Sequence, residues 1–408
     1  MALIASAPEI DGVAGRPVGW PRPMILGVAA LGAYALAYLT IYVMRARASP
    51  GPMFGDFFAF WSFARFAHQF PAARIYDVAA LQAFQLRLPG GFNGFYPYPY
   101  PPIFLLILWP LGWLGYIQAY LVWSGTTLAA YLAAVAGRDW RSPRLWLTIV
   151  APTTLLSLVS GQNGLLTAAL LIGGLRLLKA RPILAGALLG MLSFKPQFFV
   201  LVPVVLLAGR QWRGLLGVAL SITGLSLASA IAFGPSIWLD WLHATPTLLK
   251  LAEDNRQRLL SLMPTITAGL MDAGLPQGVA QAVQVVAALG AVGVLAWLFH
   301  RARKAGPGEL EAAALQVGAL LATPYAFIYD MPMVTPVAAT AFQRGMSETG
   351  GWRIAAVGAP LLAYALPLLM LQGALKGWPV GAAVLVALFV VTVKAAASDA
   401  ASAKAALI

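Results

Sequence analysis

Hydrophobic residues fall into twelve long runs, separated by short polar or basic segments. The runs cover about residues 24–44, 101–136, 145–159, 163–178, 182–194, 197–209, 214–234, 278–299, 310–326, 331–343, 354–372 and 378–396. A helix of about 20 apolar residues crosses the hydrocarbon core of a bilayer, so the pattern predicts an all-α integral membrane protein with about twelve transmembrane helices. The shortest runs would rise only about 20 Å as helices, which predicts helices broken at polar motifs inside the membrane.

Composition excludes a soluble globular fold. The 408 residues are 60% hydrophobic and only 10% charged, whereas soluble domains are about a quarter charged. The chain has no cysteine and three widely separated histidines, so we expect no disulfide, no metal site and no cofactor. The net charge of +13 is spread in twos and threes between apolar runs, which argues against nucleic acid as a partner.

These basic residues predict the topology, because cytoplasmic loops are enriched in Lys and Arg. They place in the cytoplasm a tail of residues 1–23, the loops near 138–144, 176–181, 210–213, 301–304 and 344–353, and a second tail of residues 397–408. Residues 24–396 then form one transmembrane domain. Its first apolar run is too long for a signal-peptide core, so we expect an uncleaved span.

The same assignment sends the polar turns to the extracytoplasmic face: residues 45–100, 161–163, 195–197, 235–275 and 325–330. Segment 101–136 is long enough for two helices but must cross an odd number of times, so one half is expected to be re-entrant.

The long first outside loop, residues 45–100, is rich in aromatic residues and nearly uncharged at its start. Residues 55–66 predict an interfacial helix, with bulky rings at headgroup depth. Asp56 lies at the beginning of this helix, where a carboxylate is favoured by the helix dipole. It is either a helix cap or a catalytic base at the membrane surface.

Three further polar residues interrupt apolar runs. Gln162 and Asn163 either satisfy backbone groups at a helix break or bind a sugar or phosphate. Lys195 lies in the stretch 182–209 beside Pro196 and either reaches the interface with its ammonium group or binds a phosphate.

Two other sites carry charge on the predicted outer face. Arg256 and Arg258 belong either to a solvated loop helix with paired charges or to a phosphate-binding site. Asp330 lies between two apolar runs and either pairs with a cation such as Lys195 or acts in catalysis.

Several motifs occur in a characteristic order. They are Asp56 to Trp61, Ile75-Tyr76-Asp77, Tyr98-Pro99-Tyr100-Pro101-Pro102, Ser160-Gly161-Gln162-Asn163-Gly164, the stretch from Leu184 to Pro196, and Thr323-Pro324-Tyr325. With this order and spacing the chain resembles glycosyltransferase family 87, the polyprenol-phosphate-sugar-dependent enzymes of the GT-C superfamily, over nearly its whole length.

The resemblance implies a multi-span GT-C fold, a lipid-phosphate sugar donor, inversion at the anomeric carbon and Asp56 as the general base. It also implies that tyrosines of these motifs, Tyr98 and Tyr325, contact substrate. Characterised mannosyltransferases of the family have a His after the Thr-Pro motif, where this chain has Tyr329 and Asp330. Either residue can stand in for that His, so mannose specificity does not follow directly.

We therefore hypothesise a membrane hexosyltransferase, mannosyltransferase-like, of the bacterial inner membrane, with its site facing the periplasm or exterior. Its partners are a polyprenyl-phosphate sugar donor, a lipid or glycan acceptor of the cell envelope, and membrane lipids. Asp56 deprotonates the acceptor, while Lys195 and one of Arg256 or Arg258 stabilise the leaving phosphate. The alternatives are a secondary transporter, although no paired repeats are visible, and a non-catalytic protein that binds polyprenyl lipids.

Overall fold

The computed structural model describes residues 22–48, 55–88, 94–373 and 375–405, and all regular structure in these ranges is helical. Six helices in these ranges are long and apolar enough to cross a membrane: α1 (Arg22–Ala48), α5 (Tyr116–Ala136), α12 (Trp212–Phe233), α15 (Gln277–Arg301), α18 (Trp352–Leu371) and α19 (Val380–Ala405). Large apolar side chains on them face outward, among them Ile231 and Ile354, which are 85% and 78% exposed. Such surfaces require lipid as solvent, which confirms an all-helical membrane protein.

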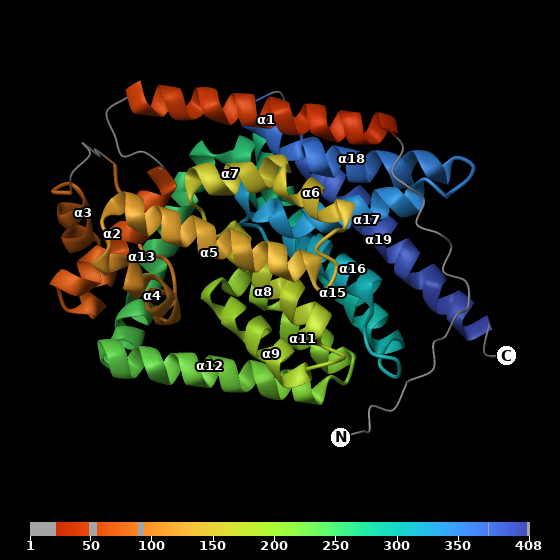
Figure 1. Cartoon of the computed structure of the whole chain (residues 1–408). Helices are drawn as coiled ribbons and strands as arrows, with labels where there is room; N and C mark the ends of the chain where they lie inside the picture. The colour runs from red at the N-terminus through yellow and green to blue at the C-terminus, as the bar shows by residue number, and fades with distance from the viewer. Residues whose placement is uncertain (1–21, 49–54, 89–93, 374, 406–408) are drawn as a thin grey trace, which may run out of the picture.

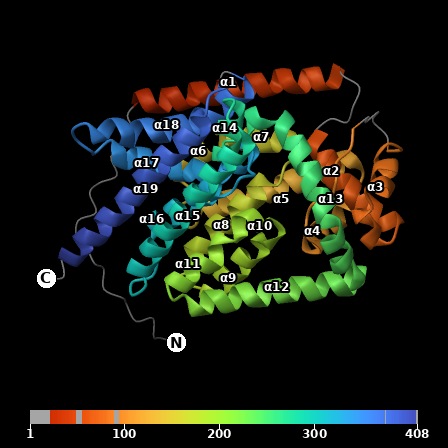
Figure 2. The same ribbon diagram turned by 180° about the vertical axis from the view of Figure 1, so that it is seen from behind.

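Shorter helices fill the space between these six (Figures 1 and 2). In the first half of the chain they are α2 (Gly55–Gln69), η1 (Ala72–Tyr76), α3 (Val78–Gln85), α4 (Pro102–Leu108), η2 (Trp109–Trp113), α6 (Pro143–Ile149), α7 (Pro152–Ser160), α8 (Gly164–Leu177), α9 (Pro182–Met191) and η3 (Leu192–Phe194). In the second half they are α10 (Pro196–Phe199), α11 (Leu201–Ala208), α13 (Ser236–Arg258), η4 (Leu260–Leu262), α14 (Ile266–Asp272), α16 (Glu309–Ala322), η5 (Ile328–Val334) and α17 (Thr335–Gly345).

The helix expected at residues 55–66 forms as α2, but its aromatic side chains are buried in protein. Phe57, Phe58, Phe60, Phe63 and Phe66 are each at most 2% exposed. Their rings pack against α4, α5 and the Tyr-Pro segment, mostly in the edge-on geometry that aromatic pairs prefer. The first turn of α2 is thereby fixed against the rest of the fold.

Segment 101–136 forms one short and one long helical piece. Helices α4 and η2 together span 102–113, which is about 18 Å of rise, whereas α5 has the length of a full span. The odd crossing number required by the positive-inside assignment is therefore compatible with α5 crossing alone.

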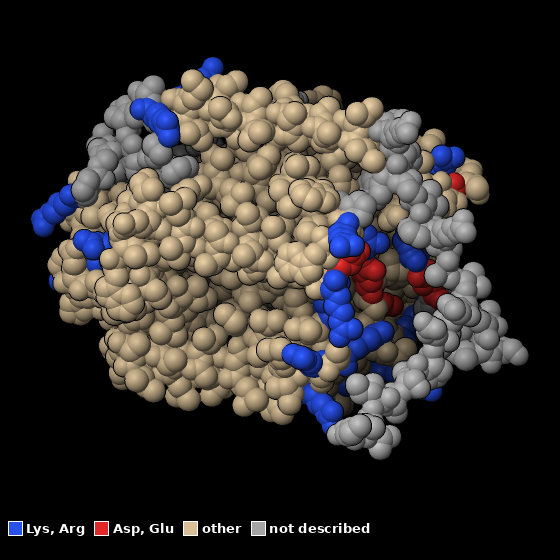
Figure 3. Space-filling view, viewed as in Figure 1, with Lys and Arg blue, Asp and Glu red and all other residues tan. Residues whose placement is uncertain are grey.

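Basic residues are densest at one end of the molecule, where acidic residues accompany them, and are fewer at the opposite end (Figure 3). There, Arg176 on α8 donates to the carbonyl oxygens of Ala134 and Val135 at the end of α5. Arg144 pairs with Glu309 across the start of α16 at 2.8 Å. Segments that the sequence grouped by charge thus lie together in space.

At the other end, α12 leads into α13, which runs towards α14 (Figure 2). Helix α13 packs against η1 and α4 of the first loop. The two long polar segments expected outside, 45–100 and 235–275, therefore contact each other.

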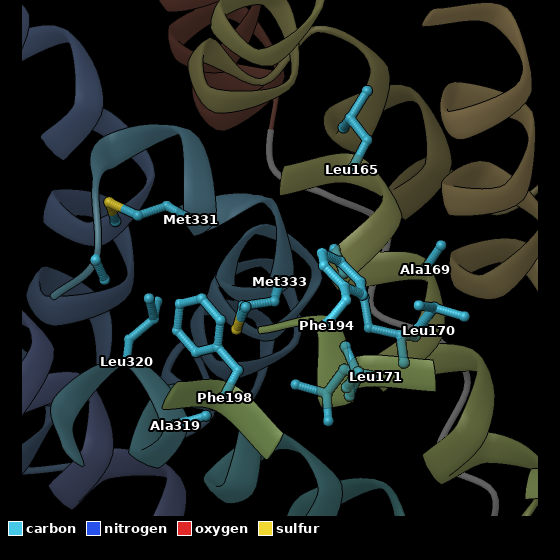
Figure 4. Packing of buried hydrophobic residues seen from close by; sticks show 14 of the residues in the cluster. Leu165, Ala169, Leu170, Leu171, Phe194, Phe198, Ala319, Leu320, Met331 and Met333 are labelled. Atoms are coloured by element: carbon cyan, nitrogen blue, oxygen red, sulfur yellow. The ribbon is translucent and has the colours of Figure 1, made fainter. Parts of the chain in front are cut away.

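The hydrophobic core lies between α8, α10, α16 and η5 (Figure 4). Phe194 and Phe198, from the segment that joins α9 to α11, are fully buried, and Phe194 stacks on Phe104 with ring centroids 4.7 Å apart. Met331 and Met333 of η5 complete this core. Lys195 and Asp330 adjoin these residues in sequence, so the core fixes their backbone positions.

Helices α9 and α12 approach so closely that glycine is required between them. A Cβ at Gly217 would lie 2.1 Å from the carbonyl oxygen of Ile183, whereas a Cβ at Gly224, farther along α12, would meet no atom within 4 Å.

We expect Gly217→Ala to lower the free energy of unfolding by about 1–3 kcal/mol, because the methyl group would push α9 and α12 apart. Gly224→Ala is the matched control in the same helix and should change it by less than about 0.5 kcal/mol. Thermal unfolding of the purified protein in detergent measures both. Equal effects of the two substitutions would contradict the close packing of α9 on α12.

Candidate functional site

The first turn of α2 meets the break between α7 and α8. Gly161 ends α7 with a positive φ of 67°, and a Cβ there would lie 2.5 Å from Cβ of Phe57. Only glycine fits this left-handed position at such a close contact. The next residue, Gln162, is consequently placed beside Asp56, and its side chain hydrogen-bonds the Asp56 carboxyl group.

The Asp56 carboxyl group is half-buried and sits between protein and the surrounding medium. Burial raises its pKa above the ordinary value of 3.8, because desolvation penalises the charged form. Hydrogen bonds from Gln162 and Tyr96 act in the opposite direction and favour the carboxylate. The result is a carboxylate that is more basic than usual and still reachable, as a general base requires.

Lys195 and Asp330 form a buried ion pair. Lys195 Nζ lies 2.5 Å from Asp330 Oδ1, and the two residues are 4% and 2% exposed. The other carboxyl oxygen, Oδ2, accepts the backbone N–H of Phe327 at 3.1 Å. The ammonium group also faces the rings of Phe198 and Tyr329 at 5.5 and 5.7 Å from their centroids. Of the two roles considered for Asp330, the structure shows the pairing with Lys195.

The backbone around Asp330 is held by hydroxyl groups of neighbouring helices. Thr153 and Ser157 of α7 donate to the carbonyl oxygens of Ile328 and Tyr329, each at 3.2 Å, and Tyr131 of α5 donates to Pro332 O at 2.6 Å. These bonds satisfy carbonyl groups that a 3-10 segment leaves open in the protein interior. The position of η5 is therefore fixed by α5 and α7.

Tyr100 is tied to the break between α7 and α8. Its hydroxyl oxygen accepts a hydrogen bond from Asn163 Nδ2 at 3.1 Å. Burial raises its pKa, and the charges of Asp330 and Asp56 raise it further. Asn163 itself is fully buried, and its Oδ1 has no partner among the described residues.

Arg256 lies near the same site from α13. It is 4% exposed, its Nη2 contacts Glu253 Oε1 at 2.5 Å, and its buried Nε has no partner among the described residues. Burial, with the charge of Asp330, raises the pKa of Tyr325 to about 12, and the charge of Arg256 lowers it. Among the described residues Arg256 therefore retains an N–H donor for a ligand.

The structure thus brings together most residues that the sequence singled out. We call the polar cluster the set of Asp56, Tyr100, Gln162, Asn163, Lys195, Arg256, Tyr325, Tyr329 and Asp330. Tyr98 is not part of the polar cluster. It is 1% exposed, and its hydroxyl group donates to Pro101 O within its own segment. The side chain of Arg258 lies outside the described residues.

Sequence reasoning missed Tyr100. The Tyr-Pro repeat offered three tyrosines at alternate positions, and an extended segment directs residues at alternate positions to the same side, so the pattern does not select among them. Neighbours in space make the selection: Tyr100 accepts a hydrogen bond from Asn163, and Tyr96 hydrogen-bonds Asp56.

No group of three or more His, Cys, Asp or Glu side chains in the described ranges is arranged to hold a metal ion. The charged groups of the polar cluster are two carboxylates, one ammonium and one guanidinium group, with Glu253 beside the last. Chemically, such a set can accept a proton from a hydroxyl group and surround an anion with cationic donors.

Comparison with known proteins gives one match. The model of glycosyltransferase family 87 matches residues 98–324, a range that contains every member of the polar cluster except Asp56, Tyr325, Tyr329 and Asp330. No curated protein and no solved structure matches the chain.

We expect Lys195→Met to lower the free energy of unfolding by about 3–5 kcal/mol, because it leaves the buried Asp330 carboxylate without its counter-ion. Asp330→Asn added to Lys195→Met removes that orphaned charge and keeps an acceptor for Phe327 N–H, so the double variant should be more stable than Lys195→Met alone. Thermal unfolding in detergent measures both. Asp330→Asn alone completes the comparison. If the double variant lost as much free energy of unfolding as the two single variants added together, Lys195 and Asp330 would not be energetically coupled.

Proposed function

This chain belongs to glycosyltransferase family 87, and on that basis we propose that it transfers a hexose from a polyprenyl-phosphate donor to a lipid or glycan acceptor. The observation that carries the proposal is the half-buried Asp56 carboxyl group at the start of α2, whose pKa is raised by burial and which Gln162 and Tyr96 hydrogen-bond. A base beside an anion site is what displacement of a phosphate by a hydroxyl group requires.

In the proposed reaction, the acceptor hydroxyl transfers its proton to the Asp56 carboxylate as its oxygen attacks the anomeric carbon. The bond from the anomeric carbon to the phosphate oxygen breaks, and the electron pair leaves with polyprenyl phosphate. One displacement of this kind inverts the anomeric centre. The phosphate is a good leaving group, so it needs electrostatic stabilisation rather than a proton.

The contacts suggest different tasks for the two cations. Lys195 is neutralised by Asp330, and both oxygens of that carboxyl group are occupied. We therefore assign Asp330 as a positioning residue for Lys195 rather than as an acid or base. Arg256 has an unpartnered N–H, which makes it the better candidate to hold the leaving phosphate.

The topology completes the proposal. We propose that the end rich in Lys and Arg faces the cytoplasm of a bacterial inner membrane, that broken short helices bring the crossings to about twelve, and that the polar cluster faces the exterior. Arg144, Arg176 and Arg344 at the basic end support this orientation. The donor's isoprenoid chain would then remain in the bilayer while its sugar reaches Asp56.

We expect Asp56→Asn to reduce the rate of sugar transfer by about 10²–10⁴-fold, the usual contribution of a general base. It should not destabilise the protein at neutral pH. The raised pKa means that the charged carboxylate costs folding free energy at any pH above its unfolded pKa, and Asn removes that cost. Transfer from polyprenyl-phosphate hexoses in liposomes and thermal unfolding measure the two effects. Full activity of the folded variant would exclude Asp56 as the base.

The pH profile tests the same assignment independently. The transfer rate should fall as the pH drops through the pKa of Asp56, with a midpoint above 3.8. Gln162→Leu removes a hydrogen bond that favours the carboxylate, so it should move this midpoint to higher pH. Gln69→Leu, an exposed change at the far end of α2, is the control. An unshifted midpoint in Gln162→Leu would argue against Asp56 as the titrating group.

A further inference from the structure

A cavity lies at the basic end, away from the polar cluster. It has a volume of about 820 Å³ and is enclosed by α5, α8, α16 and α17. Its apolar walls include Ile172, Leu175 and Val337, and its charged residues include Arg144 and Lys179. Figure 3 shows acidic and basic side chains gathered around a hollow at this end.

The cavity and the polar cluster occupy opposite ends of the same helices. Helix α8 begins beside Asn163 and ends at the cavity, and α16 begins at the cavity and ends beside Thr323. Each helix has 14 residues, or about 20 Å of rise. A ligand in the cavity therefore does not touch Asp56.

Gln316 contributes a buried hydrogen-bond acceptor to the wall of the cavity. The residue is 6% exposed and lines the cavity, and its Nε2 donates to Ala312 O at 3.0 Å. Its Oε1 is buried and has no partner among the described residues. An unpaired buried acceptor is costly, so a ligand that carries N–H or O–H groups would be stabilised here.

The charges of the cavity are mixed in sign. Asp139 and Glu309 line it together with Arg144, Arg176 and Lys179. Arg144 is paired with Glu309 and Arg176 with backbone carbonyls, whereas the exposed Lys179 ammonium has no ionic partner in the described part of the chain. Apart from the Arg144–Glu309 pair, the described lining therefore holds one cation, Lys179, and one carboxylate, Asp139, that have no ionic partner, which suits a zwitterion better than a simple anion.

The level of the cavity relative to the membrane follows from α5, one of the candidate spans. Val135 and Ala136, the last two residues of α5, line it. The ends of membrane-spanning helices lie at the level of lipid headgroups. A ligand at this depth, with apolar walls beside it and charges at the helix ends, would be an amphiphile.

We propose that this cavity binds the headgroup of a phospholipid whose amine carries N–H groups, as in phosphatidylethanolamine. Its phosphate pairs with Lys179, and its ammonium donates to Gln316 Oε1 and to the carboxylates of Asp139 and Glu309. A choline headgroup has the same phosphate and charge but no N–H donor, so it leaves Gln316 unpaired.

Native mass spectrometry of the purified full chain tests the proposal with phosphatidylethanolamine, phosphatidylcholine and soluble O-phosphoethanolamine. We expect phosphatidylethanolamine to bind about tenfold more tightly than phosphatidylcholine, the effect of one charge-assisted hydrogen bond. Gln316→Met, of similar volume, should abolish this preference. Lys179→Ala should weaken binding of both lipids by a similar factor.

Arg213→Ala is the matched control, because Arg213 is an exposed cation in the first turn of α12 that does not line the cavity. It should change neither affinity. Lys179→Ala alters only an exposed residue, so the test remains decisive if Gln316→Met is unstable. Equal binding of the two lipids by the unaltered protein, or equal weakening by Lys179→Ala and Arg213→Ala, would overturn the proposal. If O-phosphoethanolamine bound as tightly as phosphatidylethanolamine, the proposal that the bound headgroup belongs to a lipid would be wrong.

Discussion

The fold depends on one constraint: backbone groups freed where a buried helix breaks must find partners in the protein, because hydrocarbon offers none. Helix α5 meets much of this requirement. Trp123 donates its indole N–H to Gly161 O at 2.9 Å, Tyr120 its hydroxyl to Leu158 O at 2.7 Å, and Tyr131 its hydroxyl to Pro332 O. One straight helix therefore supports two broken segments, and the side chains at those breaks, Gln162 and Asp330, keep fixed positions relative to each other.

Charged groups in the interior are under the same constraint, because they too need partners within the protein. A lysine or aspartate in a low-dielectric interior is stable only when paired, and Lys195 and Asp330 satisfy each other with little exposure. Pairing leaves little uncompensated positive charge on Lys195. Among the described residues, Asp56 is hydrogen-bonded but has no ion pair, and the buried Nε of Arg256 has no partner although Nη2 contacts Glu253. The groups available to reacting molecules are thus the ones that the fold leaves incompletely satisfied.

Part of the candidate site was predictable from residues 55–66, 161–163, 195 and 330, because a polar residue in an apolar run has few explanations in a membrane protein. The helical class and the helix at Asp56 followed from periodicity. Lys195 was one of the partners considered for Asp330, and the structure shows that pair. The selection of Tyr100 over Tyr98 and the burial of the α2 aromatic side chains did not follow from the sequence, since each depends on residues distant in sequence. Short runs such as 102–113 also gave no indication of which would cross the membrane, because length alone cannot separate a broken span from a re-entrant helix.

The position of Asp56, the proposed base, follows from these constraints. A carboxylate as deeply buried as Asp330 needs a cation to remain charged, and that cation would lower its basicity. A fully exposed carboxylate would keep its ordinary pKa and gain nothing from the fold. Asp56 lies between these limits, since its half-buried position raises its pKa while Gln162 and Tyr96 support the charged form. The start of α2, anchored by buried rings but open at its first turn, is a position in this chain that meets both conditions.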